Sequence, residues 1–125
     1  MPGDKIKVLL VEDDTMIVDM YKLRLEEEGY EVTVTDRGSQ AIELAKGEKP
    51  NIILLDIILP EVDGFTVLSS LKSETAVKNI PVIIMTNLGQ ESDQEKGQRL
   101  GAEEYFVKAQ HTPADVINVI KKYLK

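Results

Sequence analysis

Five short apolar runs, separated by longer segments with helical spacing, constrain the fold of this chain most strongly. The runs cover residues 6–11, 30–35, 52–55, 81–85 and 105–107, and each has the length and apolar character of a strand buried in a sheet. The helical segments run from Met16 up to Gly29 and over residues 39–46, 64–72, 92–100 and 113–124. A regular strand–helix alternation predicts a parallel sheet with right-handed crossovers and helices on both faces. The expected fold is a doubly wound α/β sandwich of three layers, built from five βα units.

Local signals predict where several of these helices begin and end. Gly29 stands where a helix C-terminus is expected. Ser92 followed by Glu95 has the spacing of a capping box, and Thr112 before Pro113 places a cap residue ahead of a proline at the first helical position. We therefore expect the fourth helix to begin near Ser92 and the fifth helix to begin at Pro113.

Length and composition predict one soluble domain that covers residues 1–125. A chain of 125 residues with 42% hydrophobic and 30% charged residues can form one ordinary core, and the sequence contains no repeat, low-complexity tract or linker. No window reaches the roughly 18 apolar residues of a spanning helix, and the N-terminus lacks the pattern of a signal peptide. We therefore expect a cytoplasmic protein that has no membrane partner. The net charge of -7 argues against direct binding of nucleic acid.

The absence of cysteine and the single histidine, His111, restrict the chemistry further. Without cysteine there is no disulfide, thiolate zinc site or cysteine nucleophile, and one histidine cannot build a multi-histidine metal site. Any metal must therefore be held by oxygen.

Acidic, hydroxyl and amine side chains follow four of the five expected strands. Because parallel strands end at one edge of the sheet, where ligands of such sheets bind, these groups should share one rim. Carboxylates this close repel one another by about 1–4 kcal/mol per pair at surface-like dielectric, and a cation such as Mg²⁺ would relieve that repulsion. The residues are Glu12, Asp13 and Asp14 after the first strand, Asp56 after the third, Thr86 after the fourth and Lys108 after the fifth.

Most of these residues also have an ordinary structural explanation. Asp14, taken alone, is better explained as the N-cap of the first helix. Glu12 and Asp13 fit a solvated turn, Thr86 fits a β-former at a strand end, and Lys108 fits a charge on an edge strand. No single member of this group establishes a site.

The convergence of these groups around Asp56 indicates phosphoryl transfer. Asp56 follows four consecutive apolar residues, so its backbone emerges from the centre of the sheet. A carboxylate nucleophile, an ammonium, a hydroxyl donor and a metal site are the parts that this reaction needs. Asp56 would form an acyl phosphate, while Lys108 and the metal offset charge on the phosphoryl oxygens and Thr86 donates a hydrogen bond to one of them.

Four sequence blocks resemble those of the receiver domains of bacterial and archaeal response regulators, and the match covers essentially the whole chain. The blocks are VLLVEDD at 8–14, LLDIILP at 54–60 with DG at 63–64, MT at 85–86, and GAEEYFVK at 101–108. The resemblance implies a flavodoxin-like, five-stranded sheet of order 2-1-3-4-5. It also implies a signalling module rather than an enzyme, one that catalyses only its own phosphoryl transfer and dephosphorylation.

The resemblance implies a phosphoacceptor and a metal site. Asp56 would accept the phosphoryl group and also bind Mg²⁺ or Mn²⁺. Asp13 would bind the ion directly, Glu12 through water, and Ile58 through its backbone carbonyl.

The resemblance also implies a switch and two kinds of partner. Thr86 and Lys108 would contact the phosphoryl group, and Tyr105 would turn inward as Thr86 moves towards it. A sensor histidine kinase or a phosphotransfer protein would supply the phosphoryl group. The fourth and fifth helices would contact a downstream protein effector.

Several residues depart from the usual pattern of this family. Ala109, in place of proline, follows Lys108, and a cis bond before a non-proline residue costs about 2.5–4 kcal/mol, so we expect a trans bond. Asn87 is larger than the very small residue usual at its position. Ile58 and Leu88 are apolar where the family often carries polar side chains that orient water, so we predict a long-lived phosphorylated form.

Three alternative functions stay open at this point. A receiver-like adaptor would bind its partner without control by phosphorylation, because the departures at Asn87 and Ala109 would have disabled switching. A phosphatase or phosphotransferase with an aspartyl-phosphate intermediate would need a second acid where Ile58 stands. A flavin-binding module would need a loop of Gly, Ser and Thr after the first strand, where Glu12 and Asp13 stand.

Overall fold

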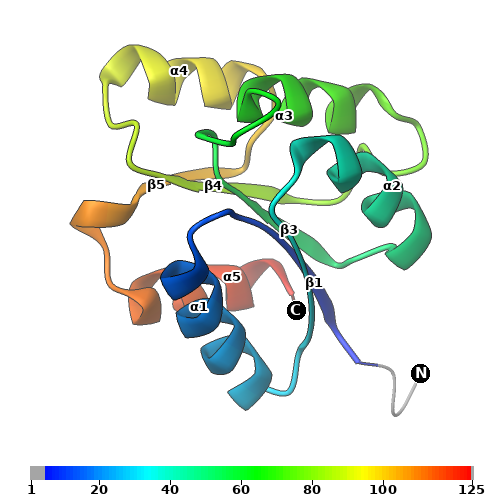
Figure 1. The fold of residues 1–125 in the computed structure, drawn as a ribbon, viewed down its shortest axis with the longest axis vertical. Coiled ribbons are helices and arrows are strands. Elements are labelled where there is room, and N and C mark those ends of the chain that lie inside the picture. The colour runs from blue at the N-terminus through cyan, green and yellow to red at the C-terminus, as the bar shows by residue number, and fades with distance from the viewer. Residues whose placement is uncertain (1–4, 125) are drawn as a thin grey trace.

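The computed structural model, which describes residues 5–124, contains a parallel sheet of five strands with five α-helices between and after them (Figure 1). The strand order is β2-β1-β3-β4-β5, which confirms the predicted fold. The elements are β1 (Lys7–Val11), α1 (Thr15–Glu27), β2 (Glu31–Thr35), α2 (Gly38–Glu48), β3 (Ile52–Leu55), α3 (Gly64–Ser73), β4 (Val82–Thr86), α4 (Glu91–Arg99), β5 (Glu104–Val107), a short 3₁₀ helix (Lys108–Gln110) and α5 (Pro113–Tyr123).

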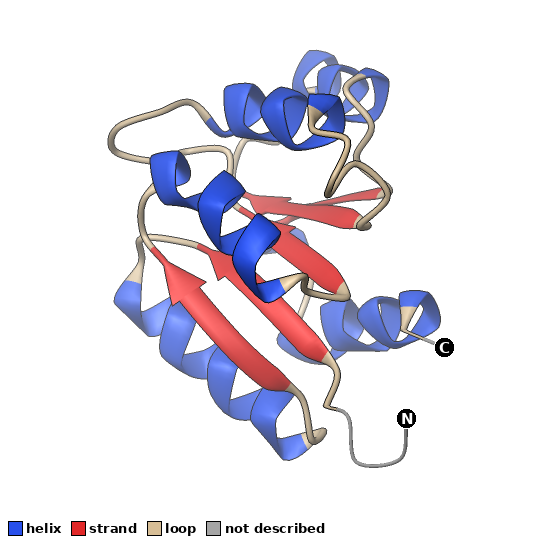
Figure 2. Ribbon diagram, turned by 90° about the vertical axis from the view of Figure 1, so that its right-hand side faces the viewer, coloured by secondary structure: helices blue, strands red, loops and turns tan. Residues whose placement is uncertain are grey.

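The helices cover both faces of the sheet. In Figure 1, α1 and α5 lie below the sheet and α2, α3 and α4 lie above it, and Figure 2 shows the same layers from the side. None of the described helices is both long enough and apolar enough to cross a lipid bilayer.

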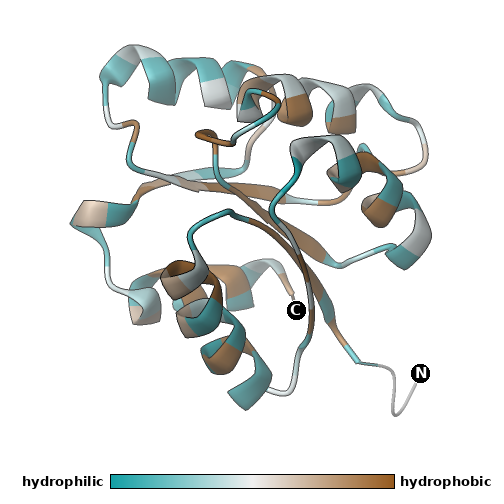
Figure 3. Cartoon of the chain, viewed as in Figure 1, coloured by the Kyte–Doolittle hydropathy of each residue, from teal (hydrophilic) through white to brown (hydrophobic). Residues whose placement is uncertain are grey.

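Each face of the sheet carries its own apolar core. Leu9, Ile53 and Leu55 belong to the core under α2 and α3, whereas Leu10 and Leu54 belong to the core under α1 and α5. Successive residues of a strand point to opposite faces, so a strand covered on both faces must be apolar at every position. This explains why the inner strands are largely continuous apolar runs, which Figure 3 shows as a hydrophobic centre between more hydrophilic helices.

Side-chain caps fix the start of α1 and α5 as predicted. Asp14 accepts hydrogen bonds from the backbone N–H groups of Met16 and Ile17 at 3.0 and 3.3 Å. Thr112 accepts one from the N–H of Asp115 at 3.2 Å, and the Asp115 carboxylate accepts one from the N–H of Thr112 at 3.1 Å. The capping reading of Asp14 and the predicted start of α5 are therefore confirmed.

The predicted capping box at Ser92 is wrong. Helix α4 begins at Glu91, its N-cap is Gln90, and no side chain caps its first turn. The side-chain amide of Gln94 instead donates a hydrogen bond to the carbonyl of Gly89 at 3.1 Å. This contact holds the first turn against the preceding loop and lets the helix begin before Ser92.

Candidate functional site

The sheet places the residues after β1, β3 and β5 at one edge. The backbone N–H of Asp56 donates to the carbonyl of Val11 at 3.0 Å, and the N–H of Glu12 donates to the carbonyl of Thr35 at 3.0 Å. Lys108 follows β5 directly. Ladder-type hydrogen bonds therefore continue past the strand ends and fix the backbone of the site.

The Lys108 ammonium joins the two buried acids of this edge. Its Nζ lies 2.6 Å from Glu12 Oε1 and donates a hydrogen bond to Asp56 Oδ2 at 2.9 Å. Burial by itself would lower the pKa of Lys108, but its close contacts with Glu12 and Asp56 and the charges of these two acids more than offset it, so the pKa is raised above its ordinary value. Lys108 is therefore a cation paired with two carboxylates and not a solvated charge on an edge strand.

The Glu12 carboxylate is buried, and its two oxygens differ in their partners. Oε2 accepts hydrogen bonds from the backbone N–H groups of Asp13 and Asp14, both at 3.1 Å. Oε1 contacts the Lys108 ammonium but is buried without a well-aligned hydrogen-bond donor among the described residues. Burial raises the pKa of Glu12 to about 7, Lys108 opposes the rise, and the charge of Asp56 adds to it.

Three carboxylates at this edge are close enough to share one cation. One oxygen each of Glu12, Asp13 and Asp56 lie within 4.8 Å of one another. With the three acids ionised, one lysine leaves a formal charge of -2. A hard divalent cation with oxygen ligands fits this donor set, and the poorly satisfied Oε1 of Glu12 marks where added positive charge is needed.

The site opens to solvent through a small cavity of about 230 Å³. Its lining consists of Glu12, Asp13, Asp14, Asp56, Ile58, Asn87 and Lys108. The structure thus brings together five of the seven predicted site residues, with Ile58 54% exposed at the opening.

Thr86 and Tyr105 lie outside this cavity. Thr86 is fully buried, and within residues 5–124 its hydroxyl accepts only a long 3.5 Å hydrogen bond from the N–H of Leu88. The Tyr105 hydroxyl donates to the carbonyl of Leu88 at 2.6 Å, and its ring lines a different groove. The roles of Thr86 and Tyr105 towards a phosphoryl group stay predictions.

The two residues after Thr86 face different surroundings. Leu88 packs against the apolar core, whereas Asn87 lines the cavity. The alternation of an extended chain was the available signal, because the residue after the buried Thr86 should face the other way.

The sequence blocks include Gly64, the first residue of α3, but did not reveal its structural role. A Cβ atom at this position would lie 2.5 Å from the carbonyl oxygen of Asp56 and 2.9 Å from that of Ile57. Only glycine lets the helix approach this backbone so closely. The loop then places the N–H of Ile58 3.0 Å from Asp56 Oδ1, so both oxygens of the Asp56 carboxylate are held.

Comparison with known proteins places this geometry in one family. A family model described as the response regulator receiver domain matches residues 8–121. The polar-differentiation response regulator DivK of Brucella anthropi is 37% identical over 117 residues, which cover 94% of this chain and 94% of DivK. In two longer relatives the match covers 46% and 44% of the relative.

Solved structures share the fold over nearly the whole chain. A CheY-like receiver domain protein from Methanospirillum hungatei has a TM-score of 0.89 and 29% identity, covering 97% of this chain and 94% of that chain. The receiver domain of sensor histidine kinase PA1611 from Pseudomonas aeruginosa has a TM-score of 0.85 and 25% identity, covering 96% of this chain and 98% of that chain. The PA1611 structure has a magnesium ion coordinated in its active site cleft.

Proposed function

Because this chain belongs to the family of response regulator receiver domains, we propose that Asp56 accepts a phosphoryl group and that its phosphorylation switches a protein-interaction surface. One observation carries the proposal: the nearly buried Asp56 carboxylate is held at Oδ1 by the Ile58 N–H and at Oδ2 by Lys108, beside two further carboxylates. Such preorganisation supplies most of what phosphoryl transfer needs from a protein.

The phosphoryl donor would be a phosphohistidine of a sensor histidine kinase or a phosphotransfer protein. A carboxylate oxygen of Asp56 attacks the phosphorus, and the phosphorus–nitrogen bond breaks with its electron pair returning to the imidazole. The Lys108 ammonium, 2.9 Å from Asp56 Oδ2, offsets negative charge on the phosphoryl oxygens. The Ile58 N–H keeps the carboxylate oriented, so little reorganisation accompanies the attack.

Receiver domains bind Mg²⁺ in their acidic site, and the same group of residues would bind it here. Glu12, Asp13 and Asp56 would hold Mg²⁺ or Mn²⁺, with the carbonyl of Ile58 as a further ligand. When bound, the ion offsets charge on the phosphoryl oxygens and relieves the repulsion among the carboxylates.

Incubation with a small acyl phosphate and Mg²⁺ tests the proposal. We expect intact-mass measurement to show one added phosphate on the wild type and none on Asp56→Asn. Asp19→Asn, which removes an exposed acid of α1, serves as the control and should be labelled like the wild type. Absence of label from the wild type would contradict the proposal.

That negative result would favour a receiver-like adaptor without control by phosphorylation. The observation behind this second candidate is that neither Thr86 nor Tyr105 lies in the cavity beside Asp56. An adaptor would bind its partner equally well as wild type and as Asp56→Asn, and in the presence or absence of the acyl phosphate.

The opening of the site bears on how long the phosphate persists. Ile58 is apolar and exposed at the opening of the cavity, so it offers no polar group to orient an attacking water. We expect the label to decay over minutes or longer after the donor is removed, and Ile58→Asn to shorten its half-life several-fold. Decay of the wild-type label within seconds in Mg²⁺ would contradict this expectation.

The output surface would lie around the edge strand β5. Helices α4 and α5 are on opposite faces of the sheet (Figure 1), and β5, at the end of the strand order, lies between them. A downstream effector that contacts both helices must therefore span this edge. The location of the protein in the cytoplasm stays a prediction from sequence.

A further inference from the structure

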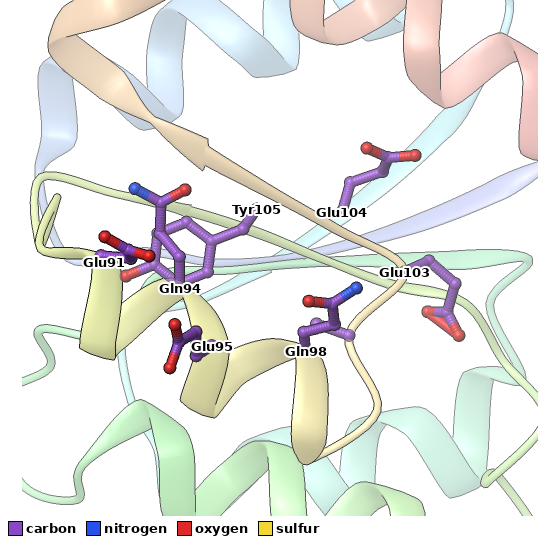
Figure 4. Close-up of a pocket in the computed structure, with 8 residues that line it drawn as sticks. Glu91, Gln94, Glu95, Gln98, Glu103, Glu104 and Tyr105 are labelled. Atoms are coloured by element: carbon purple, nitrogen blue, oxygen red, sulfur yellow. The ribbon is translucent and has the colours of Figure 1, made fainter.

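A groove of about 280 Å³ lies between α4 and β5 (Figure 4). Glu91, Gln94 and Glu95 form part of its wall on α4, and Glu104 and Tyr105 line it from β5. Among the described residues that line it are four glutamates and two glutamines but no lysine or arginine. The charged residues that line the groove are therefore all acidic, and the Glu104 carboxylate points away from α4 (Figure 4).

Two of these glutamates already have partners inside the protein. Glu103 lies 3.1 Å from the Lys72 ammonium, and Glu104 accepts a 2.6 Å hydrogen bond from a tyrosine hydroxyl of α5. Glu91 and Glu95 are exposed on the wall and form no ion pair within residues 5–124. They lie four residues apart on α4, about 5–6 Å from each other at their Cβ atoms, so they present two unpaired charges one helical turn apart.

The aromatic ring of Tyr105 lies at the base of the groove, where α4 and the Leu88 carbonyl contact it. A Cβ atom at Gly97 of α4 would lie 3.0 Å from Tyr105 Cδ2 and 2.8 Å from Ile84 Cδ1, so the glycine lets the helix rest directly on the ring. The Tyr105 hydroxyl donates to the Leu88 carbonyl at 2.6 Å. An incoming side chain would meet a preorganised aromatic surface.

Solubility or protection of the edge strand would also place acids on this face. The helix dipole also favours Glu91, in the first turn of α4, but none of these explains why a second unpaired acid, Glu95, follows at i+4, a spacing at which like charges weaken a helix, beside a hollow with an aromatic base. A second copy of the same face would bring carboxylates against carboxylates, and nucleic acids and anionic lipids would also be repelled. Charge complementarity selects a cationic protein segment.

The inference rests on the function proposed above and names the chemistry of its output partner. We propose that the groove between α4 and β5 docks a cationic segment of the downstream protein. Two lysines or arginines one helical turn apart would pair with Glu91 and Glu95, and an apolar side chain between them would cover the Tyr105 ring. Aromatic and charged contacts of this kind at a groove centre give both affinity and selectivity.

A designed amphipathic helix of leucine and lysine, and the same helix with glutamate for lysine, are the probes. Each peptide is titrated into the ¹⁵N-labelled full chain, with and without acyl phosphate and Mg²⁺, and amide shifts are followed by NMR. We expect the lysine peptide to shift α4 and β5 resonances. Glu91→Gln with Glu95→Gln should weaken its binding roughly five- to tenfold, and added salt should weaken binding to the wild type.

The control removes the same charge elsewhere. Glu26→Gln with Glu27→Gln, two exposed acids of α1, should change the affinity less than twofold. Equal weakening by both double variants, equal binding of the glutamate peptide, shifts confined to another surface, or no binding in either state would each overturn the inference. Self-association that depends on Glu91 and Glu95 would also overturn it, because the occupant would then be a second copy.

Labelling of Asp56 is measured separately on every variant. A Glu91→Gln, Glu95→Gln variant that is labelled normally but binds the peptide as the wild type does would refute the docking inference and leave the proposed function intact. A wild type that binds the peptide at the groove but accepts no phosphate would refute the proposed function alone.

Discussion

Two half-buried lysines, one at each end of the sheet, make ion pairs of similar length but stand in opposite electrostatic situations. At the carboxyl ends of the strands, Lys108 faces Glu12 and Asp56 at 2.6 and 2.9 Å. At the amino ends, Lys72 pairs with Glu103 at 3.1 Å. The lysine side chains are 14% and 18% exposed, so burial of the cation does not distinguish them.

The two ends of the sheet differ in whether the carboxylates there have enough hydrogen-bond donors and cations as partners. Lys72 and Glu103 balance in charge, Lys72 also donates to two backbone carbonyls, and the second oxygen of Glu103 accepts the N–H of Val82 at 2.6 Å. At the other end a single lysine faces three acids, and Glu12 Oε1 lacks a well-aligned donor. The balanced cluster, Lys72 with Glu103, links α3 to the start of β4 and β5. The unbalanced cluster, Lys108 with Glu12, Asp13 and Asp56, can accept additional positive charge.

The largest expected effect on stability comes from removing the lysine of the unbalanced cluster. Lys108→Met would leave Glu12 and Asp56 buried without a cation, and breaking such a pair costs about 3 kcal/mol or more. Urea unfolding should show this loss, and adding Glu12→Gln to the variant should restore part of it. A loss below about 1 kcal/mol would mean that water already screens this site.

Removing the lysine of the balanced cluster should cost less. In Lys72→Met, Glu103 keeps its bond to the Val82 N–H and its side chain is 30% exposed, so we expect a loss of about 1–2 kcal/mol. The same unfolding experiment measures it. The contrast between the two ends would be broken if Lys72→Met destabilised the protein as much as Lys108→Met.

Added Mg²⁺ should stabilise one end alone. At ten times its dissociation constant, a ligand of the folded state adds about 1.4 kcal/mol, which should raise the thermal midpoint by a few degrees. The wild type and Lys72→Met should both respond, and Asp13→Asn should respond weakly or not at all. A response that survives in Asp13→Asn would place the ion elsewhere.

The smallest effect concerns α4, which packs against Tyr105 and Ile84 through Gly97. Gly97→Ala should lower stability by about 1 kcal/mol, because crowding of Tyr105 and Ile84 outweighs the helical preference of alanine. Gly47→Ala in α2, where nothing lies within 4 Å of the added atom, should instead gain stability. If the clusters act independently of this packing, Mg²⁺ should raise the thermal midpoint of Gly97→Ala as much as that of the wild type. A smaller rise in Gly97→Ala would show that α4 and the site are coupled.

The fold could be predicted because its signals are local and repeated. The apolar run at 52–55 coincides with β3, and the run at 6–11 differs from β1 by one residue. The cap at Thr112 was correct because threonine, proline and the following acid act within one turn. The capping box at Ser92 failed because contacts with the preceding loop, such as Gln94 to Gly89, decided where α4 begins.

The candidate site was predictable only as a set of residues on one edge. Parallel strands bring their carboxyl ends together, so Glu12, Asp56 and Lys108 could be placed side by side from the strand pattern alone. That Lys108 contacts both acids depends on how the loop after β5 packs in three dimensions. No single-sequence signal fixes such packing.

The most direct measurement is the position of the phosphate. After reaction with an acyl phosphate and Mg²⁺, borohydride reduction converts a phosphorylated aspartate into a stable alcohol that peptide mass spectrometry can locate. The phosphate should lie in the unbalanced cluster. We therefore expect reduction at Asp56 in the wild type and in Lys72→Met, and no reduction when Mg²⁺ is chelated. Reduction at another residue, or labelling of Asp56 that is indifferent to Mg²⁺, would contradict the account.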